Sequence, residues 1–501
     1  MEIETLRTER TELTAAYASL AGQGLRFLTM VASDEKECGV DRFVLRYFFA
    51  KDAGKLVCLE TIVPGADPHY PSLAEVLPAT SWYEREARDL MGVVPDGHPD
   101  PRNLIFHDRF PEGIYPLRKD FTSHTFIPRT ESAFTYPLVK GEGVFEVPVG
   151  PIHAGVIEPG HFRFQVMGDT ILHLETRVFF THRGIEKKSE NMDVEKGLRL
   201  AERICTVCNV SHAMSYAQAV EQIAGAQIPA RAQYLRMLFA EMERLYNHVG
   251  DIGNICAGIG FAYGSNHGAR LKEMLLQLNE RMTGHRYLRG TIALGGVARD
   301  LDDGQLQEIL RLTQEIGKNA GEVANDVLAN GIAVDRYANT GVLAADIVRK
   351  FAAVGPAARA SGVDVDARRD HPYAAYSQLA FEVPLQSGGD VLARFNMRAL
   401  ETGQSVSLIN QIINKMPDGE IAGKIGDLPA YRYGIGITES PRGENVHFVM
   451  TGERNAIFRY RVRSAAYANW PVVPLCVPGT IVPDFPLINK SFELCYACCD
   501  R

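Results

Sequence analysis

Two pairs of cysteines have the spacing that points most clearly to chemistry. Cys205 and Cys208 stand in ERICTVCNVSH, and Cys495 and Cys498 stand in ELCYACCDR. Thiols at positions i and i+3 of a helix or tight turn project towards one point, so each pair offers two soft ligands to a metal ion. Together the four thiols suffice to close one tetrahedral site or to hold a two-metal centre. The spacing therefore predicts a metal site, but it does not name the metal.

Other interpretations of a C-x-x-C pair remain open at this point. A redox dithiol follows a strand in a thioredoxin-like pattern, which neither segment has. A structural zinc site uses pairs separated by tens of residues, whereas these pairs lie at 205–208 and 495–498. Chance explains one pair more easily than two. The remaining cysteines are expected to pack as small apolar residues, with Cys499 unresolved because it adjoins the second pair: Cys38, Cys58, Cys256, Cys476 and Cys499.

Composition and charge narrow the class of protein. The 501 residues include 53 basic and 61 acidic side chains, a formal net charge of −8, and 46% are hydrophobic. This predicts a globular chain of more than one domain, without the basic segment that would indicate nucleic acid as a partner. Nine cysteines are too few for a disulfide scaffold and predict a reducing compartment. The start MEIETLRTER is charged, and polar residues or prolines interrupt the longest uncharged runs, so neither a signal peptide nor a membrane span is expected.

The elements that must position the cysteines follow from hydrophobic periodicity. The fold class expected is α+β, with a small N-terminal α/β module, a large mainly helical core and a small β-rich C-terminal part. In the first 120 residues we expect a helix at Thr5–Leu20, strands at Leu25–Ala32, Arg42–Ala50 and Lys55–Val63, and a helix around Ser81–Met91. From about residue 150 helices are expected to dominate, notably after Pro229 and at Leu306–Leu328, Gly341–Phe351 and Val391–Met416. Short strands are expected at Tyr433–Thr438, Val446–Thr451 and Ala456–Val462. The predicted domains are 1–125 and 150–501, joined by a linker at 126–149.

Four motifs resemble those of nickel–iron hydrogenase large subunits. RICTVCNVSH is similar to the family's R-[IV]-C-G-[IV]-C-x-x-x-H, and LCYACCDR is similar to its D-P-C-x-x-C-x-x-[HR]. The segment His182–Glu186 resembles the family's R-G-x-E, and Pro441–Gly443 resembles its P-R-G. The four motifs occur in the family's order within residues 150–501, which makes the resemblance specific.

The N-terminal part resembles a second family. WYEREARDLMGVVPDGHPDPRNLIF, followed by GIYPLRKDF, is similar to the small peripheral-arm subunit of respiratory complex I. Gly150–His153 resembles the opening of the quinone-site subunit of complex I. The fusion of the two resembles the large subunit of formate hydrogenlyase and related group 4 enzymes, and this resemblance covers nearly the whole chain.

The resemblance implies the catalytic subunit of a hydrogenase that reversibly reduces protons to hydrogen. The alternative is a complex I-like quinone-binding or coupling subunit without hydrogen chemistry, a lineage in which the four cysteines are lost. A protein stabilised by structural zinc is a third interpretation, and it gives no role to Arg442 or Glu186.

The resemblance also implies roles for the cysteines. Cys205 and Cys495 would be terminal nickel ligands, and Cys208 and Cys498 would bridge nickel to an iron that carries carbon monoxide and cyanide. Thr206 and Leu494 stand where the family usually has Gly and Pro.

Four other residues receive implied roles. Arg442 would lie over the open side of the metals, although an exposed turn arginine is the simpler interpretation of the residue alone. Glu186 would relay protons from Cys495 with a pKa raised towards neutral, unless it forms a solvated pair with a neighbouring lysine. His212 would hydrogen-bond near a thiolate, unless it is a packed core histidine. Glu493 replaces the family's aspartate and keeps a carboxylate beside the metals.

Cofactors and partners follow from the same resemblance. Once four cysteines are assigned, none of the remaining five form a cluster that could hold an iron–sulfur centre, so an iron–sulfur small subunit is required as electron partner. Further electron-transfer and membrane subunits, a formate dehydrogenase and maturation proteins are the other expected partners, and magnesium is left open as a cofactor. The expected location is the cytoplasmic face of the membrane, reached through partner subunits. Because family members mature by cleavage three positions after the last ligand, the end at Arg501 indicates a processed form or a gene without the removable tail.

Overall fold

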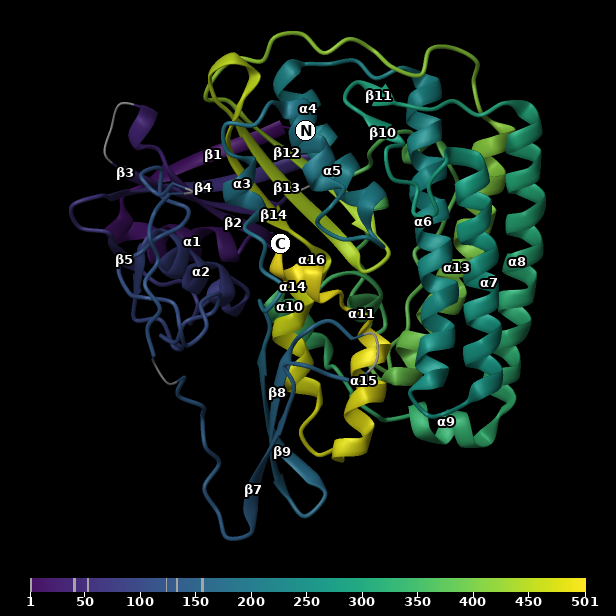
Figure 1. The fold of residues 1–501 in the computed structure, drawn as a ribbon, viewed down its shortest axis with the longest axis horizontal. Coiled ribbons are helices and arrows are strands. Elements are labelled where there is room, and N and C mark those ends of the chain that lie inside the picture. The colour runs from purple at the N-terminus through teal and green to yellow at the C-terminus, as the bar shows by residue number, and fades with distance from the viewer. Residues whose placement is uncertain (1, 39–41, 52–53, 123, 132–133, 155–156) are drawn as a thin grey trace.

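The computed structural model describes residues 2–38, 42–51, 54–122, 124–131, 134–154 and 157–501. It is a mixed α and β protein, which confirms that part of the predicted fold class (Figure 1). An N-terminal sheet, a C-terminal sheet and a group of long helices follow one another across the molecule. Residues 132–133 of the predicted linker lie outside the described residues. Among the helices described, none combines the length and the apolar character that a membrane span requires.

The N-terminal sheet has the strand order β1-β4-β3-β2. The predicted elements are present as β2 (Arg26–Asp34), β3 (Arg42–Ala50), β4 (Lys55–Pro64) and α2 (Ser81–Met91). The predicted helix Thr5–Leu20 is wrong in its first part, because β1 (Glu2–Thr8) pairs in parallel with β4 and only α1 (Leu13–Ala21) is helical. Pairing with a neighbouring strand outweighs the weak helical pattern of these residues.

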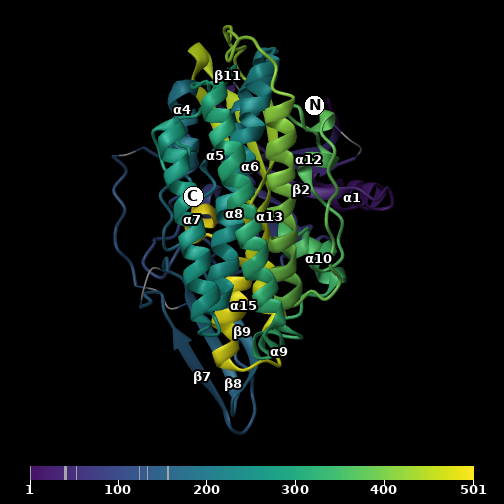
Figure 2. The same cartoon turned by 90° about the vertical axis from the view of Figure 1, so that its right-hand side faces the viewer.

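Four long helices pack side by side in the second half of the fold (Figure 2). They are α6 (Ala230–Ala257), α7 (Ala262–Thr283), α8 (Asp303–Ala329) and α13 (Val391–Asn414). Helices α6, α8 and α13, together with α10 (Ala345–Phe351), confirm the predicted helices, whereas α7 was not predicted. Helices α6 and α7 approach closely where Gly253 faces Gly268. A Cβ atom on Gly268 would lie 2.6 Å from the Cα of Gly253, so this approach requires glycine.

A third sheet, which precedes the helical region in the sequence, was not predicted. It consists of β7 (Val144–Val149), β8 (His161–Met167) and β9 (Thr170–Arg177), with antiparallel pairing throughout. The expectation that helices dominate from residue 150 is therefore incomplete. Buried Phe162, Phe164 and Val166 alternate along β8 with the period of two that marks a strand, so the signal was in the sequence.

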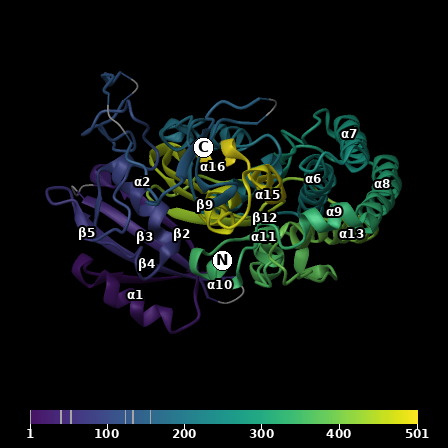
Figure 3. The ribbon, with the colours of Figure 1, turned by 90° about the horizontal axis from the view of Figure 1, so that it is seen from below.

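The C-terminal sheet contains β12 (Tyr433–Ser440), β13 (Gly443–Thr451) and β14 (Ile457–Arg463), which confirms the three predicted strands. Helix α5 (Asn209–Ala224) packs closely on β12 at Gly436. A Cβ atom at this position would come within 1.8 Å of the Ser215 carbonyl oxygen, so the close approach requires glycine. Helices α14 (Ala465–Asn469), α15 (Phe485–Phe492) and α16 (Tyr496–Asp500) follow. Seen from below, they lie between the N-terminal sheet and the long helices (Figure 3).

Candidate metal centre

The four cysteines of the two C-x-x-C pairs meet at one place. Cys205 and Cys208 precede α5, Cys495 is the N-cap of α16, and Cys498 lies within α16. The Sγ atoms of Cys205 and Cys495 are 3.2 Å apart, and Cys205 also hydrogen-bonds with the other two thiols. Three of the thiols are buried and Cys495 is half-buried. The fold thus brings together two segments from opposite ends of the region 150–501.

The thiols share protons as a cluster. Hydrogen bonding with Cys208, Cys495 and Cys498 lowers the pKa of Cys205 well below its ordinary value. Hydrogen bonding with Cys205, together with burial, raises the pKa of the other three thiols well above it. Four thiolates this close together would repel one another, so all four require a bound cation to stay ionised.

The distance between the Sγ atoms of Cys205 and Cys495 is that of two thiols in contact and not of two ligands on one metal ion. The separation of 3.2 Å is shorter than the edge of about 3.7 Å for a tetrahedral site with metal–sulfur bonds near 2.3 Å. No set of three or more His, Cys, Asp and Glu side chains in the described part of the chain already has the arrangement of a formed metal site. The chemistry of the donors nevertheless fits a soft metal, because four thiols from two segments converge.

Arg442 lies beside this cluster and is 6% exposed, so its interpretation as an exposed turn arginine is wrong. Its guanidinium donates to both carboxylate oxygens of Asp251 on α6, one of them at 2.9 Å, and to the Asn247 side-chain oxygen at 3.2 Å. Burial works to lower the pKa of Arg442, but Asp251 and then Glu493 outweigh it and raise the pKa above its ordinary value. A permanent positive charge is therefore fixed next to the thiols.

Glu493 stands opposite Arg442, with 4.0 Å between its carboxylate and the guanidinium. It accepts a hydrogen bond of 2.5 Å from the side chain of Asn254. Burial and the nearby Asp251 raise the pKa of Glu493 to about 7. Its backbone ends α15 in the left-handed region, with φ 54°, directly before Leu494 and Cys495.

His212 contacts the second cysteine pair. Its Nε2 atom is 3.0 Å from the Cys498 Sγ, and its Nδ1 atom is 2.9 Å from the Nε2 atom of His447. His447 in turn hydrogen-bonds with the Tyr460 hydroxyl at 2.9 Å. Burial lowers the pKa of His212 to about 4. The imidazole is therefore a neutral group held at both nitrogens, and sequence reasoning had not identified His447 or Tyr460.

The structure does not bear out the expected environment of Glu186. Its carboxylate accepts from Arg459 at 2.8 Å, from Arg461 at 3.2 Å and from Arg501 at 2.9 Å. Burial works to raise the pKa of Glu186, but these three cations outweigh it and hold the pKa well below its ordinary value. The expected rise towards neutral is therefore wrong, and so is the solvated pair with a neighbouring lysine, because the side chain is buried.

A different carboxylate contacts Cys495. The Oε2 atom of Glu158 lies 3.6 Å from the Cys495 Sγ and accepts from the Ala497 backbone N–H at 2.8 Å. Glu158 is half-buried in the irregular segment before β8. Sequence reasoning missed it, because an isolated glutamate in a loop carries no signal of its own.

The half-buried side of the cluster opens into a cleft of about 690 Å³. Glu158, Cys205, Thr206, Glu493 and Cys495 are among the residues that line it. A cavity of about 990 Å³ lies elsewhere, between the segments 105–127 and 182–191, and none of the four thiols lines it. The smaller cleft is therefore the one relevant to chemistry at the cysteines.

Three family models match the chain. Residues 6–126 match the respiratory-chain NADH dehydrogenase 30 Kd subunit, and residues 258–432 and 426–501 match the 49 Kd subunit of the same enzyme. Residues 183–251 match the nickel-dependent hydrogenase family.

Individual relatives cover most of the chain. Formate hydrogenlyase subunit 5 of Escherichia coli (strain K12) is 34% identical over 96% of this chain and 85% of the relative. Hydrogenase-4 component G of the same organism is 34% identical over 89% of this chain and 78% of the relative. A chain of the archaeal membrane-bound sulfane sulfur reductase complex superposes with a TM-score of 0.67 and 27% identity, and covers 73% of this chain and all of that one.

These matches and the converging thiols define the class as a nickel–iron hydrogenase large subunit. The chain belongs to the group 4 family of such subunits that includes formate hydrogenlyase subunit 5, in which a module of the complex I 30 Kd type is fused to the hydrogenase region. The resemblance predicted from the sequence motifs is confirmed.

Proposed function

We propose that this chain is the catalytic subunit of a membrane-associated nickel–iron hydrogenase that reduces protons to hydrogen, in a reaction that is reversible. The observation that carries the proposal is the convergence of four thiols from Cys205–Cys208 and Cys495–Cys498 beside a buried arginine and an open cleft. The four thiolates of Cys205, Cys208, Cys495 and Cys498 would hold a nickel–iron pair. The iron would carry carbon monoxide and cyanide.

When bound, the metal pair would supply the electron transfer and the open coordination position that interconversion of protons and hydrogen requires. The residues of the chain handle the protons and charges around it. Cys495 exchanges a proton with Glu158, which contacts this thiol and lines the same cleft. Arg442, fixed by Asp251, presents a permanent positive charge that would favour an anionic cyanide ligand. The neutral imidazole of His212 hydrogen-bonds with Cys498 and tunes that thiolate.

Electrons must come from a partner, because the five cysteines that remain do not form a set of ligands for an iron–sulfur cluster. An iron–sulfur small subunit is the partner proposed, together with further electron-transfer and membrane subunits and maturation proteins. By analogy with formate hydrogenlyase, a formate dehydrogenase is the proposed electron source, and the cytoplasmic face of the membrane is the proposed location. The predicted domains 1–125 and 150–501 are part of the proposal, and the pairing of β7 with β8 favours assigning the end of the linker to the second domain.

Magnesium is left out of the proposal. Glu86 and Glu186 are buried carboxylates that contact Arg501 in the C-terminal segment, and hard oxygen ligands of this kind are what magnesium prefers. All four of their oxygens already accept from the guanidinium groups of Arg459, Arg461 and Arg501. Three positive charges around two carboxylates do not fit a further divalent cation.

The proposed activity is tested by hydrogen formation from reduced methyl viologen, measured on the purified anaerobic complex next to its quinone reductase activity. Hydrogen formation that rises and falls with the nickel content of the preparation is the expected result. Quinone reduction without hydrogen formation would instead identify the chain as the complex I-like alternative.

A further inference from the structure

One carboxylate from the predicted domain 1–125, called the N-terminal unit below, contacts the segment that carries the second cysteine pair. Glu86 lies on α2 and is 4% exposed. Its Oε2 atom accepts from the Arg501 Nη2 at 2.9 Å and from the Tyr467 hydroxyl at 2.7 Å. Its Oε1 atom accepts from Arg461 on β14. A residue of the N-terminal unit therefore holds the end of the C-terminal segment.

Arg501 joins this carboxylate to a second one. Its Nη1 atom donates to Glu186 at 2.9 Å and to the Val462 carbonyl oxygen at 3.0 Å, and its own carbonyl oxygen accepts from the Arg183 backbone N–H at 2.7 Å. The guanidinium is 1% exposed and lies 4.6 Å from the centre of the Tyr467 ring. A planar fork with donors on two sides can span two carboxylates in this way.

Arg501 follows directly on α16, the helix that contains Cys498. A helix of five residues is not stable by itself, so contacts at its ends must hold it in place. At its C-terminal end Asp500 accepts from the backbone N–H groups of Phe179 and Thr181 at 2.8 and 2.9 Å, and Arg501 forms the ion pairs described above. At its N-terminal end lies Cys495. The position of the second thiol pair therefore depends on what fixes residues 500 and 501.

The charge of Glu86 offsets part of a local excess of positive charge around Arg501. Glu86 and Glu186 face the three guanidinium groups of Arg459, Arg461 and Arg501, which are all buried. Without the charge of Glu86, one carboxylate would remain opposite three cations. Arg501 would then lose its partner on one side and face the repulsion of Arg461, because both use Glu86 and Glu186.

We propose that Glu86 is a positioning residue for the metal centre, through which the fused N-terminal unit fixes α16 and its thiols by way of Arg501. This inference rests on the proposed function, because it concerns the position of Cys495 and Cys498 as ligands of the proposed metal pair. It gives the N-terminal unit a part in building the site, in addition to any role in docking to other subunits. The ion pairs themselves do not depend on the metal.

The test is hydrogen–deuterium exchange with mass spectrometry on the full-length protein in its purified complex. In Glu86→Gln the amides of residues 496–501 should exchange at least about tenfold faster, because breaking a buried ion pair favours local opening. Glu86→Asp keeps the charge and should restore part of the protection. The cyanide bands in the infrared spectrum should shift in Glu86→Gln, because the second thiol pair moves relative to the first.

The matched control is Arg26→Gln. Arg26 on β2 also forms an ion pair between the units, donating to Glu444 on β13 at 3.0 and 2.6 Å, but it does not hold α16. This variant should leave exchange at residues 496–501 unchanged. If Glu86→Gln does not fold, Arg501→Lys provides a second test, because a single ammonium group cannot span both carboxylates, and the same segment should loosen.

Unchanged exchange at residues 496–501 in Glu86→Gln, or equal loosening in Arg26→Gln, would overturn the inference. The failure of the proposed function would look different, because the parent complex would then contain no nickel while the exchange pattern could still be as predicted.

Discussion

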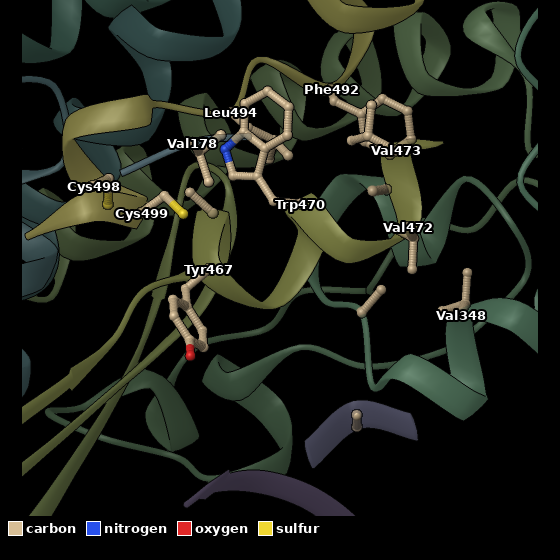
Figure 4. Close-up of a cluster of buried hydrophobic side chains, with 14 of the residues drawn as sticks. Val178, Val348, Tyr467, Trp470, Val472, Val473, Phe492, Leu494, Cys498 and Cys499 are labelled. Carbon is tan, nitrogen blue, oxygen red and sulfur yellow. The ribbon is translucent and has the colours of Figure 1, made fainter. Parts of the chain in front are cut away.

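Replacement of Cys498 by serine should abolish both nickel binding and hydrogen formation, whereas the same replacement at Cys499 should leave both close to the parent. The two thiols are adjacent in α16 but have different surroundings. Cys498 meets His212 and the other thiols of the cluster. Both thiols belong to the buried cluster that contains Val178 and Trp470 (Figure 4), but no hydrogen bond joins Cys499 to His212 or to the other thiols in the described residues.

The physical reason for the difference is the ligand chemistry. A serine hydroxyl is a hard and weakly acidic donor that does not replace a bridging thiolate. At Cys499 burial raises the pKa of the thiol well above its ordinary value, so this group is an inert, packed neutral side chain. Nickel per chain and hydrogen formation are the measurements. Loss of nickel in Cys499→Ser, with retention in Cys498→Ser, would show that the two adjacent thiols have been assigned the wrong way round.

The second large effect is expected at Glu158. Glu158→Gln keeps the hydrogen bond from Ala497 but cannot take up a proton, so hydrogen formation per bound nickel should fall about 10²-fold or more. Nickel content should stay close to that of the parent, because Glu158 is not one of the proposed ligands. The exchange of deuterium gas with solvent protons should fall in parallel, since it uses the same proton transfer.

Glu186→Gln is the contrasting variant, because Glu186 was the relay expected from the sequence. Its carboxylate is held by three arginines and stays ionised. Removing its charge should lower stability and metal loading, but should leave turnover per bound nickel largely unchanged. If turnover per nickel instead falls in Glu186→Gln and persists in Glu158→Gln, the relay runs through Glu186 after all.

The sequence predicted the cysteines better than their surroundings. Two C-x-x-C pairs and their motifs are local patterns, so they could be recognised without a fold. Asp251, by contrast, is one polar position on a long amphipathic helix, and its pairing with Arg442 depends on how α6 packs against the turn between β12 and β13. Glu158 becomes informative only through its distance to Cys495. Such contacts arise from tertiary packing and leave no periodic signal.

The same distinction between local patterns and tertiary contacts explains which elements of the fold were predicted correctly. Helix α13 was predicted with a small error at its C-terminal end, and the apolar residues after Pro229 located α6 without giving its end. Strand β1 was mistaken for a helix, because its pairing with β4 links residues more than fifty positions apart in the chain. Glu186 illustrates the electrostatic case: its motif was recognised, but the three arginines that set its pKa come from β14 and the C-terminal residue.

Infrared spectroscopy of the purified complex, combined with metal analysis, tests the central claim most directly. The account predicts nickel and iron bound to this chain, with absorption bands from one carbonyl type and from cyanide ligands that disappear in Cys498→Ser and persist in Cys499→Ser. A complex that contains neither nickel nor carbonyl and cyanide bands would contradict it. The four thiols would then have to be explained as a structural site or as part of a scaffold without hydrogen chemistry.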